Sequence, residues 1–393
     1  MFKVEKICFN FIKKHINFFY LFIITLLAIW IRLAGFNFLS GDMDHCLLPW
    51  FDKIKESKLR YTVGNYNLLY QSLIYIMTFI PIKPIYQYKI LSCIFDFALA
   101  IIVAIFSCEL LEKKRWGTHF CIVYSVIIFL PTVILNSGFW GQCDSIYVFF
   151  IILSILFLYK EKFIASFSVL GIAFAFKFQT LFIIPFYIYY YFQKQKFSLL
   201  HFCITFLVFM SSGLLCFIRG IKIYMPLKIY FGQTKDSHLF RNIHCFWVLL
   251  GDNTKFKYFA LLFTIFLLGI ALYLISKNNL DFNDKNTYLL IATWSVFVCT
   301  IFLPNMHERY TYLLDILLIV LAFLDKKYIM LATVSNLLSL ITYAKYFGEK
   351  VPQQETRFLS LMIVLLFIYF TYLVQKNVKS VESSQNLVNK EKQ

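Results

Sequence analysis

The sequence predicts an all-α protein that crosses a membrane many times, and three observations support this class. The 393 residues are 60% hydrophobic and include 47 Phe, which is more apolar surface than a soluble domain of this size could bury. Long apolar runs recur along the chain between short polar breaks, as expected for helices in a hydrocarbon layer. Lys and Arg concentrate at the ends of these runs, as they do in the loops of multi-pass membrane proteins.

The charge distribution predicts the orientation of the chain. The formal net charge is +17, but the positive side chains form no soluble basic domain or stripe, so the sequence predicts membrane lipids and no nucleic acid as partners. Four lysines lie in residues 1–17, which we assign to the cytoplasm because Lys and Arg in short loops are retained there. The polar tail, residues 376–393, is also lysine-rich, and we therefore expect both termini to be cytoplasmic.

Residues 18–375 are predicted to form one transmembrane domain of about twelve helices. After the first helix, residues 37–87 form an external first loop with amphipathic interfacial helices. The apolar run 68–82 is assigned to that loop, because a span there would place the basic segment 112–115 outside. The predicted spans are residues 18–36, 88–110, 117–135, 145–159, 163–176, 180–192, 197–217, 257–276, 287–303, 310–324, 327–345 and 357–375.

Four short polar segments interrupt the apolar chain: residues 41–45 (GDMDH), 140–144 (WGQCD), 177–179 (KFQ) and 307–309 (HER). The predicted threading brings all four polar segments to the external face of the membrane. Ionisable groups at the ends of membrane helices are costly, so they are functional candidates. We therefore expect the four polar segments to meet in one extracytoplasmic site.

Asp42 and Asp44 follow the first predicted helix and are the candidates for a general base. A carboxylate beside a low-dielectric region can be poised to accept a proton. The alternative is a helix cap, because residues 45–56 have the pattern of an amphipathic interfacial helix. An aspartate pair could also bind a divalent cation with a phosphate, but two carboxylates do not define a metal site, and no cofactor is predicted.

The second polar segment offers an indole, an amide and a carboxylate at a helix start. Trp140, Gln142 and Asp144 are the groups that a site needs to hold an array of sugar hydroxyls. The alternative places Trp140 in the aromatic belt of the membrane surface and makes Asp144 a helix cap. The spacing of these residues does not separate the two interpretations.

The third and fourth polar segments supply cations and hydrogen-bond donors. Lys177, His307 and Arg309, with the amide of Gln179, suit a phosphate leaving group, on which charge develops during transfer. The alternative for a single lysine or arginine between apolar helices is that its charged end extends to the membrane surface.

With these four polar segments in this order, residues 20–325 resemble the GT-C glycosyltransferases, a multi-helix class that takes sugars from polyprenyl-phosphate carriers at the outer face. Gly41-Asp42-Met43-Asp44 followed by Pro49-Trp50 resembles the first-loop motif of that class. The other segments are most similar to those of bacterial relatives of the second mannosyltransferase of GPI-anchor synthesis. They read Trp140-Gly141-Gln142-Cys143-Asp144-Ser145, Lys177-Phe178-Gln179 and Met306-His307-Glu308-Arg309-Tyr310.

The resemblance implies a GT-C-like fold and an inverting transfer of a hexose. Asp42, or Asp44 as the alternate, would be the general base for an acceptor hydroxyl that attacks C1 of a polyprenyl-phosphate sugar. Lys177, Gln179, His307 and Arg309 would bind the donor phosphate. The sugar, or a glycan or glycolipid acceptor, would be held by Trp140, Gln142, Asp144 and Glu308. Mannose as the hexose rests on the family likeness.

Two other functions stay open at this point. A lipid-linked glycan flippase or transporter would usually carry internal repeats and polar residues at the membrane midplane, and no convincing repeat is present. Asp96 and Asp315 are acids within predicted spans that could line an interior groove. A polysaccharide polymerase or ligase would use the same lipid phosphates, usually with a larger external loop.

Overall fold

The computed structural model describes residues 3–235, 238–278, 280–348 and 353–391, and its regular structure is almost entirely helical. The first α-helices are α1 (Lys3–Lys14), α2 (Ile16–Ala34), α3 (Leu48–Ser57), α4 (Leu68–Met77), α5 (Pro84–Leu110), α6 (Thr118–Ile128), α7 (Pro131–Ile134), α8 (Asp144–Tyr159), α9 (Phe163–Phe176) and α10 (Ile184–Lys194). The others are α11 (His201–Ser211), α12 (Leu214–Ile218), α13 (Met225–Gln233), α14 (Phe246–Leu250), α15 (Lys257–Asn278), α16 (Lys285–Phe302), α17 (Tyr312–Leu324), α18 (Ile329–Tyr346) and α19 (Gln353–Glu391).

Short helices of other kinds and two short strands complete the described structure. The π-helices are η1 (Met43–Leu47) and η2 (Leu135–Phe139). The 3₁₀-helices are η3 (Phe178–Ile183), η4 (Thr254–Phe256) and η5 (Lys326–Tyr328). The strands are β1 (Phe240–Arg241) and β2 (Met306–His307), which pair in parallel.

The structure agrees with an all-α membrane protein but does not confirm twelve spans. Among the described residues, five helices are long and apolar enough to cross a membrane: α2, α5, Thr254–Lys277, α16 and Glu355–Val378. A sixth results if Thr118–Ile128 and Pro131–Phe139, which meet at 55°, form one bent span. The apolar helices α4, α8, α9, α11 and α17 are shorter.

Each predicted span coincides with helical structure, although several are interrupted. The span predicted over residues 117–135 bends at Pro131, because proline lacks an N–H and its ring clashes with the preceding turn. The span predicted over residues 197–217 divides at Gly213 into α11 and α12. Residues 376–391, predicted as a polar tail, instead continue α19.

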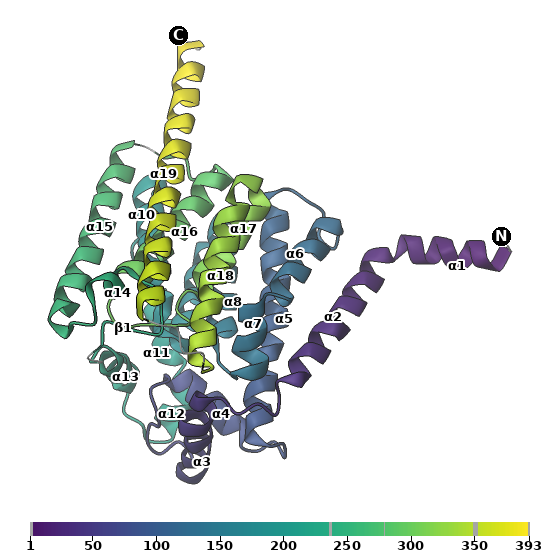
Figure 1. The fold of residues 1–393 in the computed structure, drawn as a ribbon, viewed down its shortest axis with the longest axis vertical. Coiled ribbons are helices and arrows are strands. Elements are labelled where there is room, and N and C mark those ends of the chain that lie inside the picture. Colours follow the sequence, from purple (N-terminus) through teal and green to yellow (C-terminus); the bar gives the residue numbers. More distant parts are fainter. Residues whose placement is uncertain (1–2, 236–237, 279, 349–352, 392–393) are drawn as a thin grey trace.

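The longer helices form a bundle, and several short helices gather at one end of it (Figure 1). The short helices α3, α4, α12 and α13 lie together at the lower end of the bundle in this view, whereas α19 projects beyond its upper end. Helices α1 and α2 diverge from one side.

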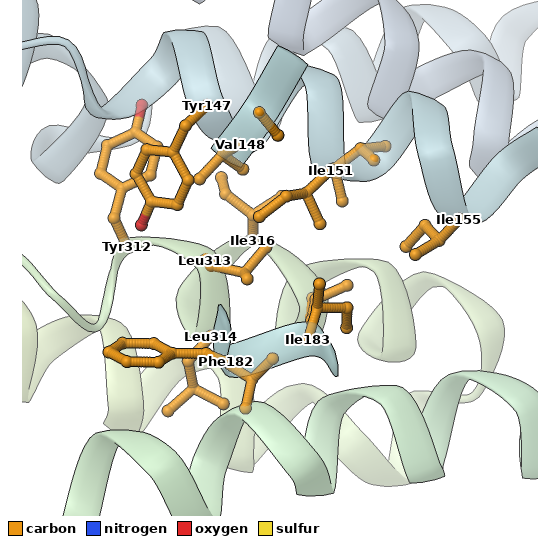
Figure 2. Packing of buried hydrophobic residues seen from close by; sticks show 14 of the residues in the cluster. Tyr147, Val148, Ile151, Ile155, Phe182, Ile183, Tyr312, Leu313, Leu314 and Ile316 are labelled. Carbon is orange, nitrogen blue, oxygen red and sulfur yellow. The ribbon is translucent and has the colours of Figure 1, made fainter. Parts of the chain in front are cut away.

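At the centre of the bundle, a layer of buried apolar side chains lies between α8 and α17. Figure 2 shows Val148 and Ile151 of α8 facing Leu313 and Ile316 of α17, with Ile183 of η3 beside them. These side chains are fully buried, so their packing holds the three elements at fixed distances. This packing fixes the relative positions of α8, which begins at Asp144, η3, which follows Lys177, and α17, which begins three residues after Arg309.

A buried ion pair fastens α2 to the bundle. Arg32 Nε lies 2.8 Å from Asp96 Oδ2, and the guanidinium also donates to the carbonyls of Ala28 and Ile128. Ser137 of η2 donates to the same Asp96 oxygen. Both charged side chains are almost fully buried, so each depends on the other for compensation.

Replacement of Arg32 by Leu is expected to destabilise the protein strongly, because it leaves Asp96 buried without its cation. Removing one partner of a buried pair costs roughly 3–5 kcal/mol in soluble proteins. The melting temperature of the detergent-solubilised protein should fall well below that of the wild type, while Arg60→Leu, at an exposed position, should leave it nearly unchanged. An unaltered melting temperature for Arg32→Leu would contradict a stabilising role of the pair.

The two-residue sheet connects two distant parts of the chain. Phe240 pairs with Met306 and Arg241 with His307, and the Met306 N–H donates to the Leu239 carbonyl at 3.1 Å. The segment that follows α13 is therefore tied to the polar segment 307–309. This link places α13 near the polar segment 307–309.

Candidate active site

One carboxylate oxygen of Asp42 accepts hydrogen bonds from two other polar segments. Its Oδ2 lies 2.7 Å from Gln142 Nε2, 2.9 Å from Arg309 Nη1 and 3.0 Å from Trp140 Nε1. These donors stabilise the ionised carboxylate and fix its orientation. The Asp42 side chain remains 30% exposed, so a hydroxyl from outside the protein can reach it.

Trp140 is fully buried and orients Asp42. Its ring stacks on Tyr346 with centroids 3.8 Å apart, and the Arg309 guanidinium lies 5.3 Å from its centroid. The hydroxyl of Tyr346 also accepts the Asp42 backbone N–H at 2.7 Å. The buried ring offers no exposed surface to a sugar, and its N–H donates to the Asp42 carboxylate, so the role of Trp140 in sugar binding stays a prediction.

Gln142 connects Asp42 to the first loop. Its Nε2 donates to Asp42, while its Oε1 accepts a hydrogen bond from the Tyr66 hydroxyl at 2.6 Å. Burial raises the pKa of Tyr66 well above its ordinary value, which keeps the phenol protonated and able to donate. Gln142 is itself buried, and it holds the Asp42 carboxylate in this structure.

Asp144 and Lys177 form a buried ion pair where two helices are interrupted. Asp144 begins α8, and Lys177 has an extended backbone between α9 and η3. Lys177 Nζ donates to Asp144 Oδ1, and Asn136 Nδ2 donates to Asp144 Oδ2 at 2.9 Å. Asp144 is buried and compensates cations in this structure, and its role in sugar binding stays a prediction.

Arg309 joins the two acidic positions. It contacts Asp42 directly, and its Nε lies 3.6 Å from Asp144 Oδ2. Glu308 approaches Arg309 Nη1 to 3.7 Å, and burial raises the pKa of its carboxyl, an effect that Arg309 opposes. The cations Lys177 and Arg309 are thus already matched by the carboxylates of Asp42 and Asp144.

A pocket of about 670 Å³ lies beside this cluster. The four residues predicted to bind the donor phosphate all line it, together with two lysines from the α13 region: Lys177, Gln179, His307, Arg309, Lys228 and Lys235. The buried Oε1 of Gln179 has no hydrogen-bond partner among the described residues, so a ligand hydroxyl could donate to it. The volume is ample for a sugar phosphate, since small-molecule pockets span roughly 300–1,000 Å³.

Residues of all four polar segments therefore meet, which confirms their predicted convergence, but Asp44 does not join them. Its side chain is exposed, and its nearest charged partner is His45 at 3.6 Å. Residues two apart in a helix point in widely different directions, so Asp42 points toward the cluster while Asp44 points away. The structure favours Asp42 over Asp44 as a base.

The two acids that could line an interior groove have partners within the protein. Asp96 pairs with Arg32, and Asp315 Oδ1 accepts a hydrogen bond from Ser335 of α18 at 3.0 Å. Neither acid lines the pocket beside Arg309. Within the described residues, no group of three or more His, Cys, Asp or Glu side chains is placed to hold a metal ion.

Three residues of the site were not predicted from the sequence. Tyr66 and Tyr346 contact Gln142 and Asp42, and Asn136 bridges Asp144 to the Tyr343 hydroxyl. Tyrosine is abundant in this chain, so neither Tyr66 nor Tyr346 stands out from its neighbours. Asn136 was detectable in principle, because an amide within an apolar run needs a buried partner.

A scan against protein-family models found no match, and neither did a search of curated proteins. The geometry of the site therefore carries the functional conclusions. Fold and site together define a helical protein with candidate membrane spans, an oriented carboxylate and an adjacent cation-lined pocket.

Proposed function

We propose that the protein is an integral-membrane glycosyltransferase of the GT-C type. It moves a hexose, mannose by family likeness, from a polyprenyl-phosphate carrier to a glycan or glycolipid acceptor outside the cytoplasm. The observation that carries this proposal is Asp42, a partly exposed carboxylate held by Trp140, Gln142 and Arg309 next to a pocket lined by cations. That combination suits a base beside the binding site of an anionic donor.

In the proposed reaction, Asp42 removes the proton of an acceptor hydroxyl. The oxygen forms a bond to C1 of the sugar while the bond from C1 to the phosphate oxygen breaks. The proton ends on the Asp42 carboxylate, and the anomeric configuration inverts because attack and departure occur on opposite faces. Neither a covalent intermediate nor a metal is required.

The donor phosphate gains charge in this step. A phosphodiester with one negative charge leaves as a monoester with up to two, so cations near the leaving oxygen stabilise the transition state more than the ground state. Arg309 is suited to this task because it both lines the pocket and contacts Asp42. It would couple the position of the base to that of the leaving group.

The site faces the extracytoplasmic side in this proposal, and both termini are cytoplasmic. The short helices α3, α4, α12 and α13 lie at the end of the bundle opposite the projecting end of α19 (Figure 1). The lysines of residues 1–17 support a cytoplasmic N-terminus.

Reconstitution tests the proposed activity. The purified protein in liposomes should consume a polyprenyl-phosphate hexose and release polyprenyl phosphate when an acceptor glycan is present, as followed by mass spectrometry. A panel of mannose and glucose donors identifies the hexose. If no donor is consumed with any cell-envelope acceptor fraction, the proposed activity is wrong.

Replacement of Trp140 by Phe is expected to slow transfer without weakening donor binding. Phe removes the indole N–H that fixes Asp42 Oδ2 but keeps most of the ring that packs on Tyr346. We expect kcat to fall roughly tenfold, which is less than the 10²–10³-fold loss seen when a hydrogen-bond donor to the reacting atoms is removed. The KM for the lipid donor should be nearly unchanged. Steady-state kinetics with the lipid donor measure both; a changed KM alone would contradict this role.

A further inference from the structure

The two cations at the centre of the site are already compensated. Lys177 pairs with Asp144, and Arg309 contacts Asp42 at 2.9 Å and Asp144 at 3.6 Å. A phosphate that displaced Asp144 from Lys177 would leave a fully buried carboxylate without its cation, which is costly. The donor phosphate therefore needs positive charge from another wall of the pocket.

That wall is formed by α13 and the residues just after it. Lys228 and Gly232 are four residues apart in α13 and share one face of that helix, and Lys235 lies in the turn after it; all three line the pocket. Both lysines are exposed, and neither has an ion-pair partner among the described residues. No acidic residue belongs to the described lining of the pocket.

The position of α13 is fixed by contacts on its other faces. Tyr230 packs against Phe174 and Phe209, and its hydroxyl donates to the Phe174 carbonyl. Asn67 Nδ2 donates to the Pro226 carbonyl at 3.0 Å, which joins α13 to the first loop. Lys228 is thus presented from an anchored helix, and Lys235 lies in the turn that directly follows it.

The outer side of the same region is apolar and uncovered. Phe231 is 68% exposed and Ile223 is 67% exposed, which suits residues that insert into the membrane surface. A lipid phosphate at that surface would lie at the level of Lys228, with its hydrocarbon chain beside Phe231. A free sugar phosphate has no hydrocarbon chain, so it would gain no binding energy from these apolar side chains.

We infer that Lys228 and Lys235 form the binding site for the phosphate of the lipid donor and retain the sugar-free polyprenyl phosphate after transfer. The inference rests on the proposed function for the identity of the donor. It assigns phosphate binding to the α13 wall, and it leaves Lys177 with a structural role. Because the site recognises phosphate and the chain attached to it, the sugar is not needed for binding.

Equilibrium binding of radiolabelled polyprenyl phosphate to the purified full-length protein tests this inference. The variant with both Lys228→Gln and Lys235→Gln should bind about tenfold or more weakly, because two charge-assisted contacts are lost. Lys222→Gln is the matched control, since Lys222 is exposed in the same region but does not line the pocket. Its affinity should stay within about twofold of the wild type.

A second variant fills the pocket without changing its charge. A Cβ on Gly232 would have no atom within 4 Å, so Gly232→Leu should fold normally and still weaken binding. Polyprenol of the same chain length should bind poorly, and inorganic phosphate should compete only weakly. Equal affinity of the double variant and the wild type, or an equal loss in Lys222→Gln, would overturn the inference; so would tight binding of inorganic phosphate alone.

The same measurements separate the two proposals. If polyprenyl phosphate binds through Lys228 and Lys235 but no sugar is transferred, the phosphate site stands and the proposed activity fails. If sugar is transferred and the double variant has an unchanged KM for the donor, the activity stands and the phosphate site fails.

Discussion

Replacement of Asp42 by Asn should abolish sugar transfer while leaving the protein folded and able to bind its donor. Asn keeps the shape of the side chain and an oxygen that can accept from Trp140 and Gln142. It removes the negative charge that accepts the proton, and loss of a general base costs roughly 10²–10⁴ in rate. Donor consumption by the reconstituted variant, compared at equal protein abundance, measures the effect.

Asp44→Asn is the matched control for this experiment. Asp44 is two residues away, exposed, and close to His45 rather than to the cluster. Its replacement should leave kcat within about twofold of the wild type, as expected for an exposed side chain outside the site. If Asp42→Asn transferred sugar normally and Asp44→Asn did not, Asp44 rather than Asp42 would be the general base.

The second large effect concerns the buried pair of Asp144 and Lys177. Asp144→Leu leaves Lys177 buried without a counter-charge, and Lys177→Met does the same to Asp144. Each single variant should lose roughly 3–5 kcal/mol of stability, whereas replacing both partners removes the uncompensated charge and should cost less. Thermal unfolding in detergent, followed by circular dichroism or scattering, gives the order of the three variants.

An exposed pair provides the comparison. Lys196 and Glu161 also form an ion pair, but both side chains are 44% exposed. Lys196→Met and Glu161→Gln should each change stability by about 1 kcal/mol or less, because exposed pairs contribute little. Equal melting temperatures for Asp144→Leu and the wild type would show that the buried pair is not required for the fold.

The helical class and the grouping of the polar segments could be predicted from the sequence for simple physical reasons. Long apolar runs identify helices because lipid offers the backbone no hydrogen-bond partners. Charged residues at the ends of such runs are conspicuous, so Asp42, Lys177 and Arg309 could be named without coordinates. The structure shows that these residues meet, but it does not confirm the threading of about twelve spans from which their convergence was predicted.

The partners within the site could not be predicted, because they depend on packing between distant segments. The pairing of Lys177 with Asp144 instead of a ligand requires the relative rotation of α8 and α9. The burial of Trp140 depends on Tyr346, which is far away in sequence and one of 26 tyrosines. The approach of Lys228 and Lys235 to the pocket could not be predicted either, because it depends on how α13 packs against the rest of the bundle.

The number of membrane spans could not be predicted from the sequence pattern either. Apolar runs predict helices, but they do not reveal breaks such as the one at Gly213 or the bend at Pro131. Several short apolar helices, among them α8 and α17, are buried inside the bundle rather than facing lipid. Hydropathy alone does not separate a short buried helix from a span.

Mass spectrometry of the lipid-linked glycans from membranes that contain either the wild type or Asp42→Asn tests the central claim most directly. The wild type should convert a polyprenyl-phosphate hexose to polyprenyl phosphate and yield an acceptor heavier by one hexose, and Asp42→Asn should leave donor and acceptor unchanged. Movement of an intact lipid-linked glycan across the membrane with no new glycosidic bond would contradict the claim and identify a flippase.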